Sequence, residues 1–489
     1  MIENILNGFA LIFTMSGLIG IGTGILVGYV VGAMPGLTSS IGMALLIPFT
    51  FGMDPIAAIV MLVTIYMASD YGGAIPAILV NAPGQPASAV TAFDGFAMTQ
   101  RGEAGKALNI SIMASTVGAL ISIVFLVATA QAMASAALAF GPAEYFALAL
   151  LGLSLIAVLG TSSTLKSLVG LVFGLAIITI GIDPISGATR FVFHFTLIDG
   201  IPFLPALIGL FALSEVFLMI EEGNRKPVQT RTKSALDMSL RHIWPFRMTI
   251  LRSSVIGYFV GVIPGAGATI ASLISYGISK RLSSTSESYG KGNPEGVAAA
   301  ESANNASVSG ALAPLLSLGI PGSASAAVLI GGLTIQGLQP GPMLFANNPE
   351  VPYSIFAALL VGLPVMVVIG FLGVPLWVRM TQVPRPIVAT LVTSIAMLGA
   401  YASANSSFEM LVTAVFGVIG YLLRKADIHP APIVLALVLG EMMEANLRRA
   451  LITGNESITY LLTKPITAVL LLMAAIILLS PFFSRKPAT

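Results

Sequence analysis

The chain has 489 residues, of which 56% are hydrophobic and only 9% are charged, and its formal net charge is +2. A soluble domain carries about 25% charged residues because its surface must face water, so this composition excludes a water-soluble globular protein and indicates that lipid is the solvent. The absence of cysteine excludes disulfides and thiolate-bound metals.

A helix that crosses a bilayer needs roughly 20 mostly apolar residues, and such stretches recur from one end of the chain to the other. We predict uninterrupted apolar segments at 8–33, 107–130, 145–160, 167–182, 200–220, 250–279, 353–374, 386–402, 409–423 and 465–483. Segments interrupted by Pro, Gly or polar residues lie at 39–69, 311–345 and 428–447. The sequence therefore predicts an all-α polytopic membrane protein with about 10 to 13 crossings, the first of them a retained helix.

Two blocks of sequence occur twice, in the same order. The block at 28–36 (GYVVGAMPG) recurs at 257–265 (GYFVGVIPG), and the block at 72–90 aligns without gaps on 310–328. Each block carries a Pro-Gly pair at the same position in both copies, which we interpret as an internal duplication. The predicted parts are a first transmembrane repeat (1–220), a basic linker (221–252) and a second transmembrane repeat (253–489).

The positive charges of matched loops have opposite bias. Residues 1–27 contain no Lys or Arg, whereas 221–252 contain seven. After the second block the bias reverses, because Arg101 and Lys106 follow the first copy and 336–352 contain neither residue type. Since Lys and Arg accumulate in cytoplasmic loops, we predict inverted-topology repeats with a cytoplasmic 221–252 linker and an external N-terminus. Inverted repeats are typical of secondary transporters.

The duplicated Pro-Gly pairs predict a broken helix with a hairpin tip in each repeat, since Pro removes a backbone donor and breaks a helix. A helix N-terminus at such a tip offers unpaired N–H groups to an anion, and Gly84 and Gly322 would let the backbone approach a ligand closely. The regions 1–100 and 292–378 contain no Lys or Arg, so a carboxylate site there would depend on backbone dipoles and neutral donors such as Thr91. For any single pair, a simple kink is the alternative interpretation. The predicted substrate-binding residues are Pro35, Gly36, Asn81, Pro83, Gly84, Gln85, Ser88, Pro321, Gly322, Ser323 and Ser325.

Polar side chains near both tips predict a site for a coupling ion. If 295–307 is helical, Glu301, Asn304 and Asn305 share one face, and Asp70 stands just before the first tip. Intramembrane carboxylates commonly serve ions or protons, whereas helix capping at a membrane entrance is the structural alternative. We expect no metal other than a transported sodium ion, because the three His residues lack metal-ligand spacing.

Missing motifs narrow the function further. The chain has no G-x-x-x-x-G-K-[ST], no H-E-x-x-H and no G-x-S-G sequence. P-loop ATP hydrolysis and the usual zinc and serine intramembrane protease sites are therefore excluded. We expect a protein that is not an enzyme and that uses no cofactor.

Three stretches resemble the TctA-type large membrane subunit of the tripartite tricarboxylate transporters. They read PGLTSSIGMALLIPFTFGMDPIAAIVMLVTIYMASDYGGAIPAILVNAPGQPASAVTAFDGFAM, GNPEGVAAAESANNASVSGALAPLLSLGIPGSASAAVLIGGL and LVLGEMMEANLRRAL. The resemblance covers nearly the whole chain and departs from the family pattern at Asp70, where a small residue or Gly is expected.

This resemblance implies a binding-protein-dependent secondary transporter in the bacterial inner membrane. The implied partners are a small four-helix membrane subunit and a periplasmic solute-binding protein, with no nucleic acid. The implied substrates are citrate-like tricarboxylates and other organic carboxylates, driven by a sodium or proton gradient. The alternatives are a stand-alone ion-coupled carboxylate carrier and a membrane complex subunit that does not transport.

Overall fold

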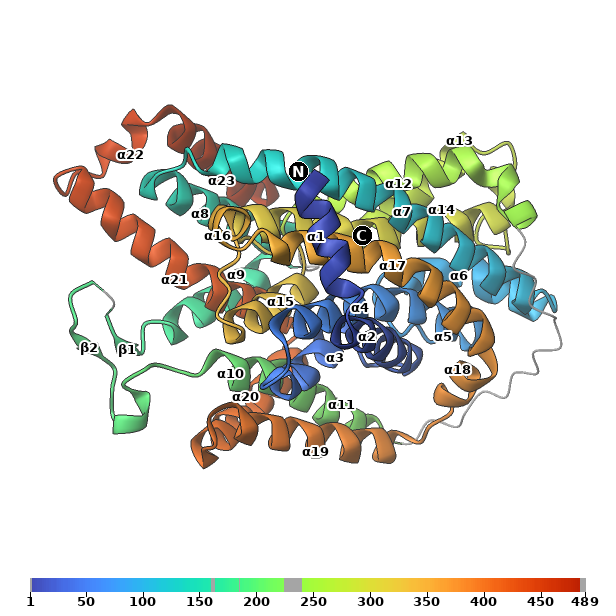
Figure 1. The fold of residues 1–489 in the computed structure, drawn as a ribbon, viewed down its shortest axis with the longest axis horizontal. Coiled ribbons are helices and arrows are strands. Elements are labelled where there is room, and N and C mark those ends of the chain that lie inside the picture. Colours follow the sequence, from blue (N-terminus) through green and yellow to red (C-terminus); the bar gives the residue numbers. More distant parts are fainter. Residues whose placement is uncertain (1, 160–162, 184, 224–239, 484–489) are drawn as a thin grey trace.

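The fold is that of a computed structural model that describes residues 2–159, 163–183, 185–223 and 240–483 (Figure 1). Half of the predicted linker, residues 224–239, lies outside the described residues. The helices before the linker are α1 (Ile2–Ile12), α2 (Met15–Ala33), α3 (Ser39–Leu46), α4 (Pro55–Gly72), α5 (Ala74–Val80), α6 (Ser88–Gln100), α7 (Ala104–Ala137), α8 (Pro142–Leu159), α9 (Thr164–Ile177), α10 (Phe203–Ile208) and α11 (Ser214–Glu222).

The part after the linker is also helical. Its helices are α12 (Arg247–Val262), α13 (Gly267–Leu282), α14 (Pro294–Leu318), α15 (Ala324–Ile335), α16 (Pro342–Asn347), α17 (Glu350–Leu372), α18 (Val374–Met380), α19 (Arg385–Ala404), α20 (Ser407–Lys425), α21 (Pro430–Thr453), α22 (Thr459–Thr463) and α23 (Pro465–Phe483). Short 3-10 turns are η1 (Ile47–Thr50), η2 (Phe195–Leu197), η4 (Leu240–His242), η5 (Trp244–Phe246) and η6 (Ser286–Ser288), and a π-turn, η3 (Gly209–Leu213), joins α10 to α11. Strands β1 (Gly181–Ile182) and β2 (Thr189–Arg190) pair antiparallel.

Nine helical segments among the described residues are long and apolar enough to cross a membrane. They are Met15–Ala33, Pro55–Val80, Ala104–Ala137, Pro142–Leu159, Phe203–Glu222, Glu350–Leu372, Arg385–Ala404, Ser407–Lys425 and Pro430–Thr453. An all-helical, multi-pass membrane protein is therefore confirmed. The predicted number of about 10 to 13 crossings is higher, and shorter apolar stretches such as Thr164–Ile177 and Pro465–Pro481 account for part of the difference.

Three predicted segments have wrong boundaries. The segment 8–33 is split, because the Thr14 side chain accepts a hydrogen bond from the Gly17 amide and starts α2 as a new helix. The segment 250–279 is two helices, α12 and α13, separated by the turn that contains Pro264 and Gly265. The segment 428–447 is uninterrupted, because its prolines lie in the first turn of α21, where the missing N–H groups have no helical acceptor.

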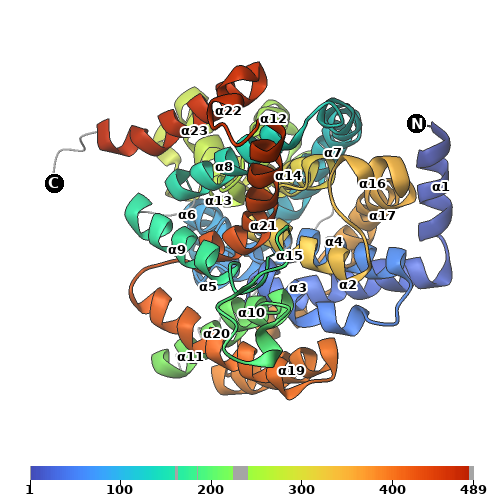
Figure 2. The same cartoon turned by 90° about the vertical axis from the view of Figure 1, so that its left-hand side faces the viewer.

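Helix α14 is the central helix of the molecule. Every residue from Gly296 to Ser317 is buried, and α14 packs against α7, α12, α13 and α6. This polar helix is long enough to cross a membrane but is too polar to count among the nine apolar segments. Figure 2 shows it near the centre of the bundle, with α1 and α23 on opposite flanks.

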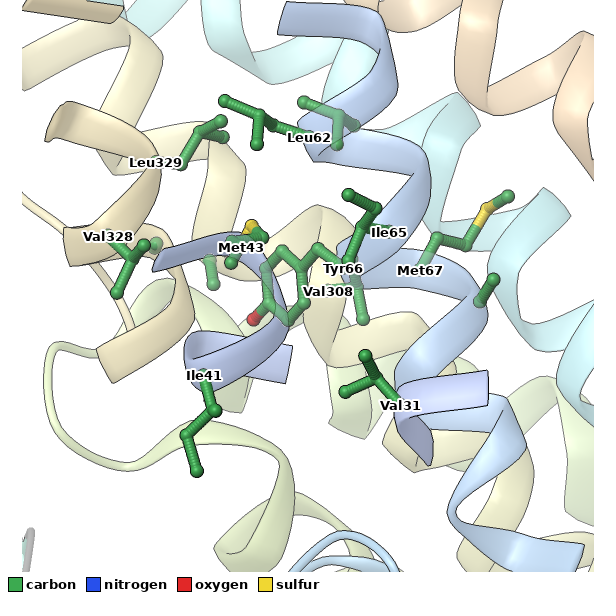
Figure 3. Close-up of a cluster of buried hydrophobic side chains, with 14 of the residues drawn as sticks. Val31, Ile41, Met43, Leu62, Ile65, Tyr66, Met67, Val308, Val328 and Leu329 are labelled. Carbon is green, nitrogen blue, oxygen red and sulfur yellow. The ribbon is translucent and has the colours of Figure 1, made fainter. Parts of the chain in front are cut away.

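The hydrophobic core joins helices from before and after the linker. One cluster brings Met43 of α3 and Leu62 of α4 together with Val308 of α14 and Leu329 of α15 (Figure 3). These side chains are at most 1% exposed, so the two halves of the chain share one core. The elements that carry the predicted tips are held by this core.

Candidate functional site

The two predicted tips follow α5 and α14 and have the same backbone geometry. Each preceding helix ends in a left-handed residue, Asn81 with φ +54° and Gly319 with φ +73°. The amide of the next residue donates to the carbonyl of Pro76 in the first tip, at 3.3 Å, and of Pro314 in the second tip, at 3.2 Å. The chain then turns back and starts α6 or α15.

The tip glycines pack against backbone. A Cβ on Gly84 would overlap the carbonyl oxygen of Gly32, and a Cβ on Gly322 would lie 2.5 Å from the carbonyl oxygen of Gly261. Gly32 and Gly261 occupy the same position in the duplicated block 28–36 and 257–265. The close approach that these glycines make in the structure is therefore to helices α2 and α12, and a larger residue at Gly84 would displace the tip.

Five hydroxyl groups meet beside the second tip. The Ser325 hydroxyl lies 2.7 Å from that of Ser39 and 3.2 Å from that of Ser40, within hydrogen-bond distance of both. The Tyr66 hydroxyl is hydrogen-bonded to that of Ser323 at 2.8 Å. Helices α3, α4 and α15 thus contribute to one polar cluster, which we call the hydroxyl cluster (Ser39, Ser40, Tyr66, Ser323 and Ser325).

The start of α15 adds backbone donors to the hydroxyl cluster. The Ala326 amide donates to the Ser323 side chain and the Ala327 amide to the Ser323 carbonyl. The amides of Ala324 and Ser325 are left without a protein acceptor in the described part of the chain. In the first tip, by contrast, the first three amides of α6 donate to carbonyls of the tip itself. The second tip therefore offers the better anion site.

The first tip is held by a side chain and lines a groove. Gln85 is 4% exposed, and its Nε2 donates to the Ser69 hydroxyl at 2.7 Å. Asn81 is exposed and Pro83 is half-buried. Both contribute to an open groove of about 520 Å³, whose other lining residues are Ala89, Ala92, Phe93, Phe96, Ala97, Gln100 and Gly290.

The first Pro-Gly pair of the sequence lies apart from these contacts. Pro35 and Gly36 are half-buried between α2 and α3, and a Cβ on Gly36 would lie 3.0 Å from the Glu215 carboxylate of α11. Pro35 and Gly36 are linked to the site only through the chain, because Ser39, a member of the hydroxyl cluster, follows Gly36 by three residues. Pro321, in the second tip, is buried.

Asp70 and Asn304 connect the hydroxyl cluster to α14. Asp70 is 5% exposed, and its carboxylate accepts from the Ser39 hydroxyl at 3.2 Å. The Asn304 amide nitrogen donates to the Asp70 backbone carbonyl at 3.3 Å. The Asn304 side-chain oxygen has no hydrogen-bond partner among the described residues.

Glu301 lies one turn before Asn304 and joins α14 to α6 and α7. Its carboxylate accepts hydrogen bonds from the hydroxyls of Thr91 and Ser115, the latter at 2.9 Å. Asn305 donates to the same Ser115 hydroxyl at 2.8 Å. Glu301 is fully buried, and no Lys or Arg pairs with it in the described chain. All four residues predicted for the coupling ion are therefore buried on or beside α14.

Asp94 anchors α6 to the start of α14. Its Oδ1 accepts from the backbone amides of Gly290, Gly292 and Asn293 at 2.8, 2.8 and 2.7 Å. Its Oδ2 accepts from the Tyr276 hydroxyl at 2.7 Å. Asp94 is fully buried, so one carboxylate holds the loop before α14 and helix α13 to the helix after the first tip.

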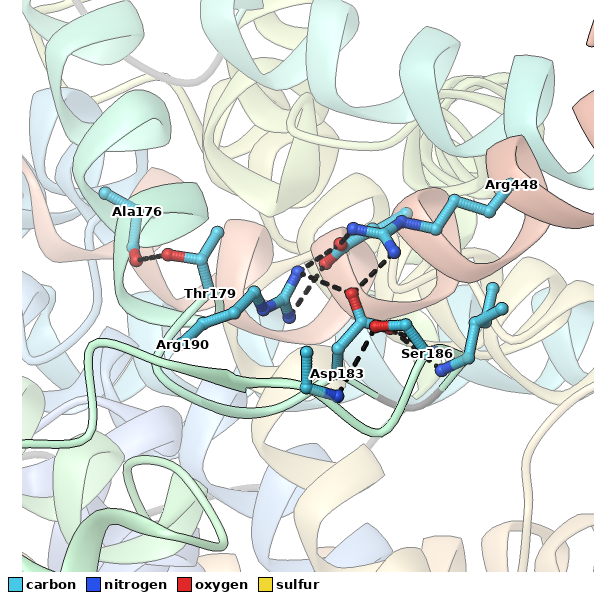
Figure 4. A network of polar contacts seen from close by, with 9 residues as sticks. Ala176, Thr179, Asp183, Ser186, Arg190 and Arg448 are labelled. Atoms are coloured by element: carbon cyan, nitrogen blue, oxygen red, sulfur yellow. Dashed lines mark hydrogen bonds and ion pairs between the residues drawn. The ribbon is translucent and has the colours of Figure 1, made fainter.

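A second polar network lies at the far end of the molecule, where the β1–β2 hairpin projects (Figures 1 and 4). Asp183 pairs with Arg190 at 3.4 Å and with Arg448 of α21 at 2.5 Å. Glu444 pairs with the same two arginines, at 2.5 and 2.8 Å. These alternating charges hold the hairpin to α21.

The hairpin carboxylate is stabilised in its charged form. The backbone amides of Ser186 and Ile185 donate to Asp183, each at 2.9 Å. Together with the charge of Arg448, they lower the pKa of Asp183 to about 2. Asp183 therefore keeps its charge across the physiological pH range.

Sequence reasoning missed several residues that complete the site. Ser39 and Ser40 follow the first Pro-Gly block by three and four residues, and Tyr66 lies one turn before Asp70. Ser115 belongs to a run of small polar residues at helical spacing on α7, which is the signal that could have revealed it. No local sequence pattern reveals the role of Asp94, because the backbone amides from which it accepts hydrogen bonds lie in a loop almost 200 residues away.

The chain is similar to known proteins over most of its length. The pattern of the tripartite tricarboxylate transporter TctA family matches residues 18–435. An uncharacterized 52.8 kDa protein in the TAR-I ttuC' 3' region of Agrobacterium vitis is 35% identical over 99% of this chain and 98% of its own length. An uncharacterized protein in the TAR-II ttuC' 3' region of the same organism is 36% identical over 47% of this chain and 96% of its own length. No solved structure matches the chain.

Proposed function

The chain belongs to the tripartite tricarboxylate transporter TctA family, and from this premise we propose that it is the substrate-translocating subunit for tricarboxylates or related organic carboxylates. In this proposal it acts in the bacterial inner membrane, driven by a sodium or proton gradient. A periplasmic solute-binding protein delivers the substrate, and a small four-helix membrane subunit completes the complex. Family membership supports transport as the role of the chain, in place of catalysis.

The observation that carries the proposed substrate site is the hydroxyl cluster at the start of α15. Two backbone amides without a protein acceptor among the described residues lie at the start of α15 beside the five hydroxyls, and residues 292–378 contain no Lys or Arg. Neutral donors and a helix N-terminus bind a carboxylate without burying a permanent positive charge. Such a site releases its anion more readily than one with a fixed Arg or Lys counter-ion.

Matched contacts in the two halves support the proposed inverted repeats. Helix α14 has 25 residues and at about 1.5 Å per residue is about 37 Å long. At its start, the Arg101 side chain after α6 donates to the Gly292 carbonyl. At its end, the Gly341 amide after α15 donates to the Leu316 carbonyl at 3.1 Å. Helices α6 and α15 follow equivalent tips, so the segments after them contact opposite ends of α14.

The proposed coupling-ion residues are Asp70, Glu301, Asn304 and Asn305. They lie on α4 and α14, which precede the two tips in the chain. Asp70 bonds to the hydroxyl cluster through Ser39, so an ion bound near it would offset the negative charge of a carboxylate substrate. This arrangement gives a physical reason for ion and substrate to bind together.

The test is uptake of labelled citrate and other carboxylates into proteoliposomes with an imposed sodium or proton gradient. The vesicles contain the chain, the small subunit and the binding protein, or the chain alone. We expect gradient-dependent uptake that requires the partners, and Ser325→Ala should raise the half-saturating substrate concentration roughly 2- to 13-fold through loss of one neutral hydrogen bond. Ser122→Ala is the matched control, because that hydroxyl bonds only to the Ala119 carbonyl within α7.

The alternatives give different results in the same assay. Full uptake by the chain alone identifies a stand-alone carrier. No carboxylate uptake under any gradient, with all partners present, contradicts the transport proposal. Wild-type affinity in Ser325→Ala places the substrate site away from the second tip.

A further inference from the structure

Three buried oxygen atoms on α6 and α14 have no hydrogen-bond partner among the described residues. They are Ser88 Oγ, Asn304 Oδ1 and Asn305 Oδ1, and their residues are 0%, 0% and 1% exposed. Both amide nitrogens are already used, since Asn304 donates to the Asp70 carbonyl and Asn305 donates to Ser115. Buried polar atoms are seldom left unpaired in native proteins, so these oxygens point to a ligand.

The helix register brings these oxygens together. Asp94 of α6 bonds to Asn293 before the first turn of α14, and Thr91 bonds to Glu301 two turns further along α14. Lower numbers on α6 therefore meet higher numbers on α14, and the helices are antiparallel here. Ser88 lies one turn before Thr91, and Asn304 and Asn305 lie one turn after Glu301, so they face each other across this contact.

The same contact contains a buried carboxyl group. Glu301 is fully buried, and the hydrogen bonds that it accepts from the described residues, such as those of Thr91 and Ser115, come from neutral hydroxyls. A buried carboxylate without a cation is unfavourable even when hydroxyls surround it. The contact thus combines one carboxylate with neutral oxygens that lack donors.

This donor set fits a monovalent metal ion. Glu301 is the single carboxylate of this donor set, since the Asp70 carboxylate bonds to Ser39 in the hydroxyl cluster. It neutralises one positive charge, and a divalent ion would leave an uncompensated charge in the core. A proton on Glu301 would remove the negative charge but would leave the Ser88, Asn304 and Asn305 oxygens unpaired. A small alkali cation satisfies the charge and these oxygens together, because each oxygen can coordinate it.

We propose that Glu301, Asn304, Asn305 and Ser88 form a sodium site between α6 and α14. Ser88 is the first residue of α6 after the first tip, and the other three lie on the central helix. A bound ion therefore fixes the start of α6, and with it the first tip, against α14. The role of this ion in driving uptake rests on the proposed function, whereas its binding does not.

The test measures ion binding without transport. The purified full-length chain in detergent is titrated with sodium chloride against choline chloride at constant ionic strength. The readouts are thermal stability and bound ²²Na⁺. We expect saturable sodium binding to the wild type and loss of that binding in Glu301→Gln. Ser88→Ala should weaken sodium binding roughly 2- to 13-fold, the effect of losing one neutral polar contact.

Two matched controls separate the site from general damage. Glu295→Gln removes another carboxylate of α14. Like Glu301, Glu295 accepts hydrogen bonds from two hydroxyls, those of Thr249 at 2.6 Å and Ser283 at 2.7 Å. Ser302→Ala removes a neighbouring hydroxyl that bonds to the Ala298 carbonyl. Both variants should bind sodium like the wild type, and each variant is compared with its own stability in choline.

The outcomes distinguish this inference from the proposed function. Sodium binding that disappears in Glu301→Gln supports the site even if no carboxylate is transported. Sodium-driven uptake with unchanged sodium binding in both Glu301→Gln and Ser88→Ala overturns the site and leaves the proposed function intact. A wild-type chain that binds no sodium also overturns it. If Glu301→Gln does not fold, Asn304→Ala and Ser88→Ala decide, and wild-type affinity in both rejects the site.

Discussion

Replacing Asp94 with Asn should loosen the start of α14 by an amount that can be worked out from its contacts. The carboxylate accepts three backbone N–H bonds and one Tyr276 hydroxyl bond, all of 2.7 or 2.8 Å. Hydrogen bonds to a charged group contribute about 1.5–3 kcal/mol each, but Asn keeps one acceptor oxygen and the effects of neighbouring bonds are not additive. We therefore expect a net loss of about 2–4 kcal/mol of local stability, below the sum of the individual bonds.

Hydrogen exchange measured by mass spectrometry tests this value directly. Since 1.36 kcal/mol is a factor of ten, the amides of Gly290, Gly292 and Asn293 should lose about 30- to 900-fold in protection in the Asp94→Asn variant. Tyr276→Phe removes only the fourth bond and should cause a smaller loss.

A control is available at another helix start. Asp54 accepts from the Ala57 amide at 3.0 Å and caps α4, so Asp54→Asn should change exchange there and leave 290–293 unaffected. Unchanged protection of the three amides in Asp94→Asn would refute the anchoring role of this carboxylate.

Three further predictions follow from contacts described above. In this cysteine-free chain, single cysteines at Ser288 and Asn348 should react with an impermeant reagent from opposite sides of the membrane, and labelling from one side would exclude inverted repeats. Tyr66→Phe and Ser323→Ala both break the 2.8 Å hydroxyl contact, so each should weaken substrate affinity roughly 2- to 13-fold, and the double variant should cost no more than the larger single effect if that bond is the cause. Because the pKa of Asp183 is lowered to about 2, its stabilising contribution should be complete above the ordinary value of about 3.9 and be lost as pH falls toward 2. Limited proteolysis of the β1–β2 hairpin should therefore stay slow from pH 7 to about 4, and acceleration already near pH 6 would contradict the lowered pKa.

Local sequence patterns predicted the helical architecture, and chain turns occur where the Pro-Gly pairs of the second block stand. The turn residues at 81–87 and 319–323 follow from Pro, Gly and Asn, whose backbone preferences act within a few residues. The split at Thr14 was missed because an N-cap inside an apolar stretch does not lower its hydropathy. The continuous α21 was missed because Pro430 and Pro432 break a helix only outside its first turn.

The candidate site could be predicted only in part, because its contacts join distant segments. Glu301 and Asn304 stood out as polar residues in an apolar sequence, and the structure places them in the core. The bond between Ser39 and Ser325 spans 286 residues, and no local pattern specifies such a pairing. The packing of Gly84 on Gly32 was equally invisible, since a glycine in the sequence does not reveal what approaches it.

The polarity of α14 has a consequence for how the protein reaches the membrane. During insertion, a charged residue at the centre of a helix costs about 2.5–3.5 kcal/mol, and each Val or Leu offsets only about 0.3–0.6 kcal/mol. The Val and Leu residues of α14 therefore do little more than offset Glu301, and its Asn and Ser residues still have to be accommodated. We therefore expect α14 to enter the bilayer by packing against helices that are already inserted. Its main packing partners, α7 and α12, are both synthesised before it. Because α7 lies before the linker, a chain that begins at residue 253 would leave α14 without the helix that shelters Glu301 during biogenesis.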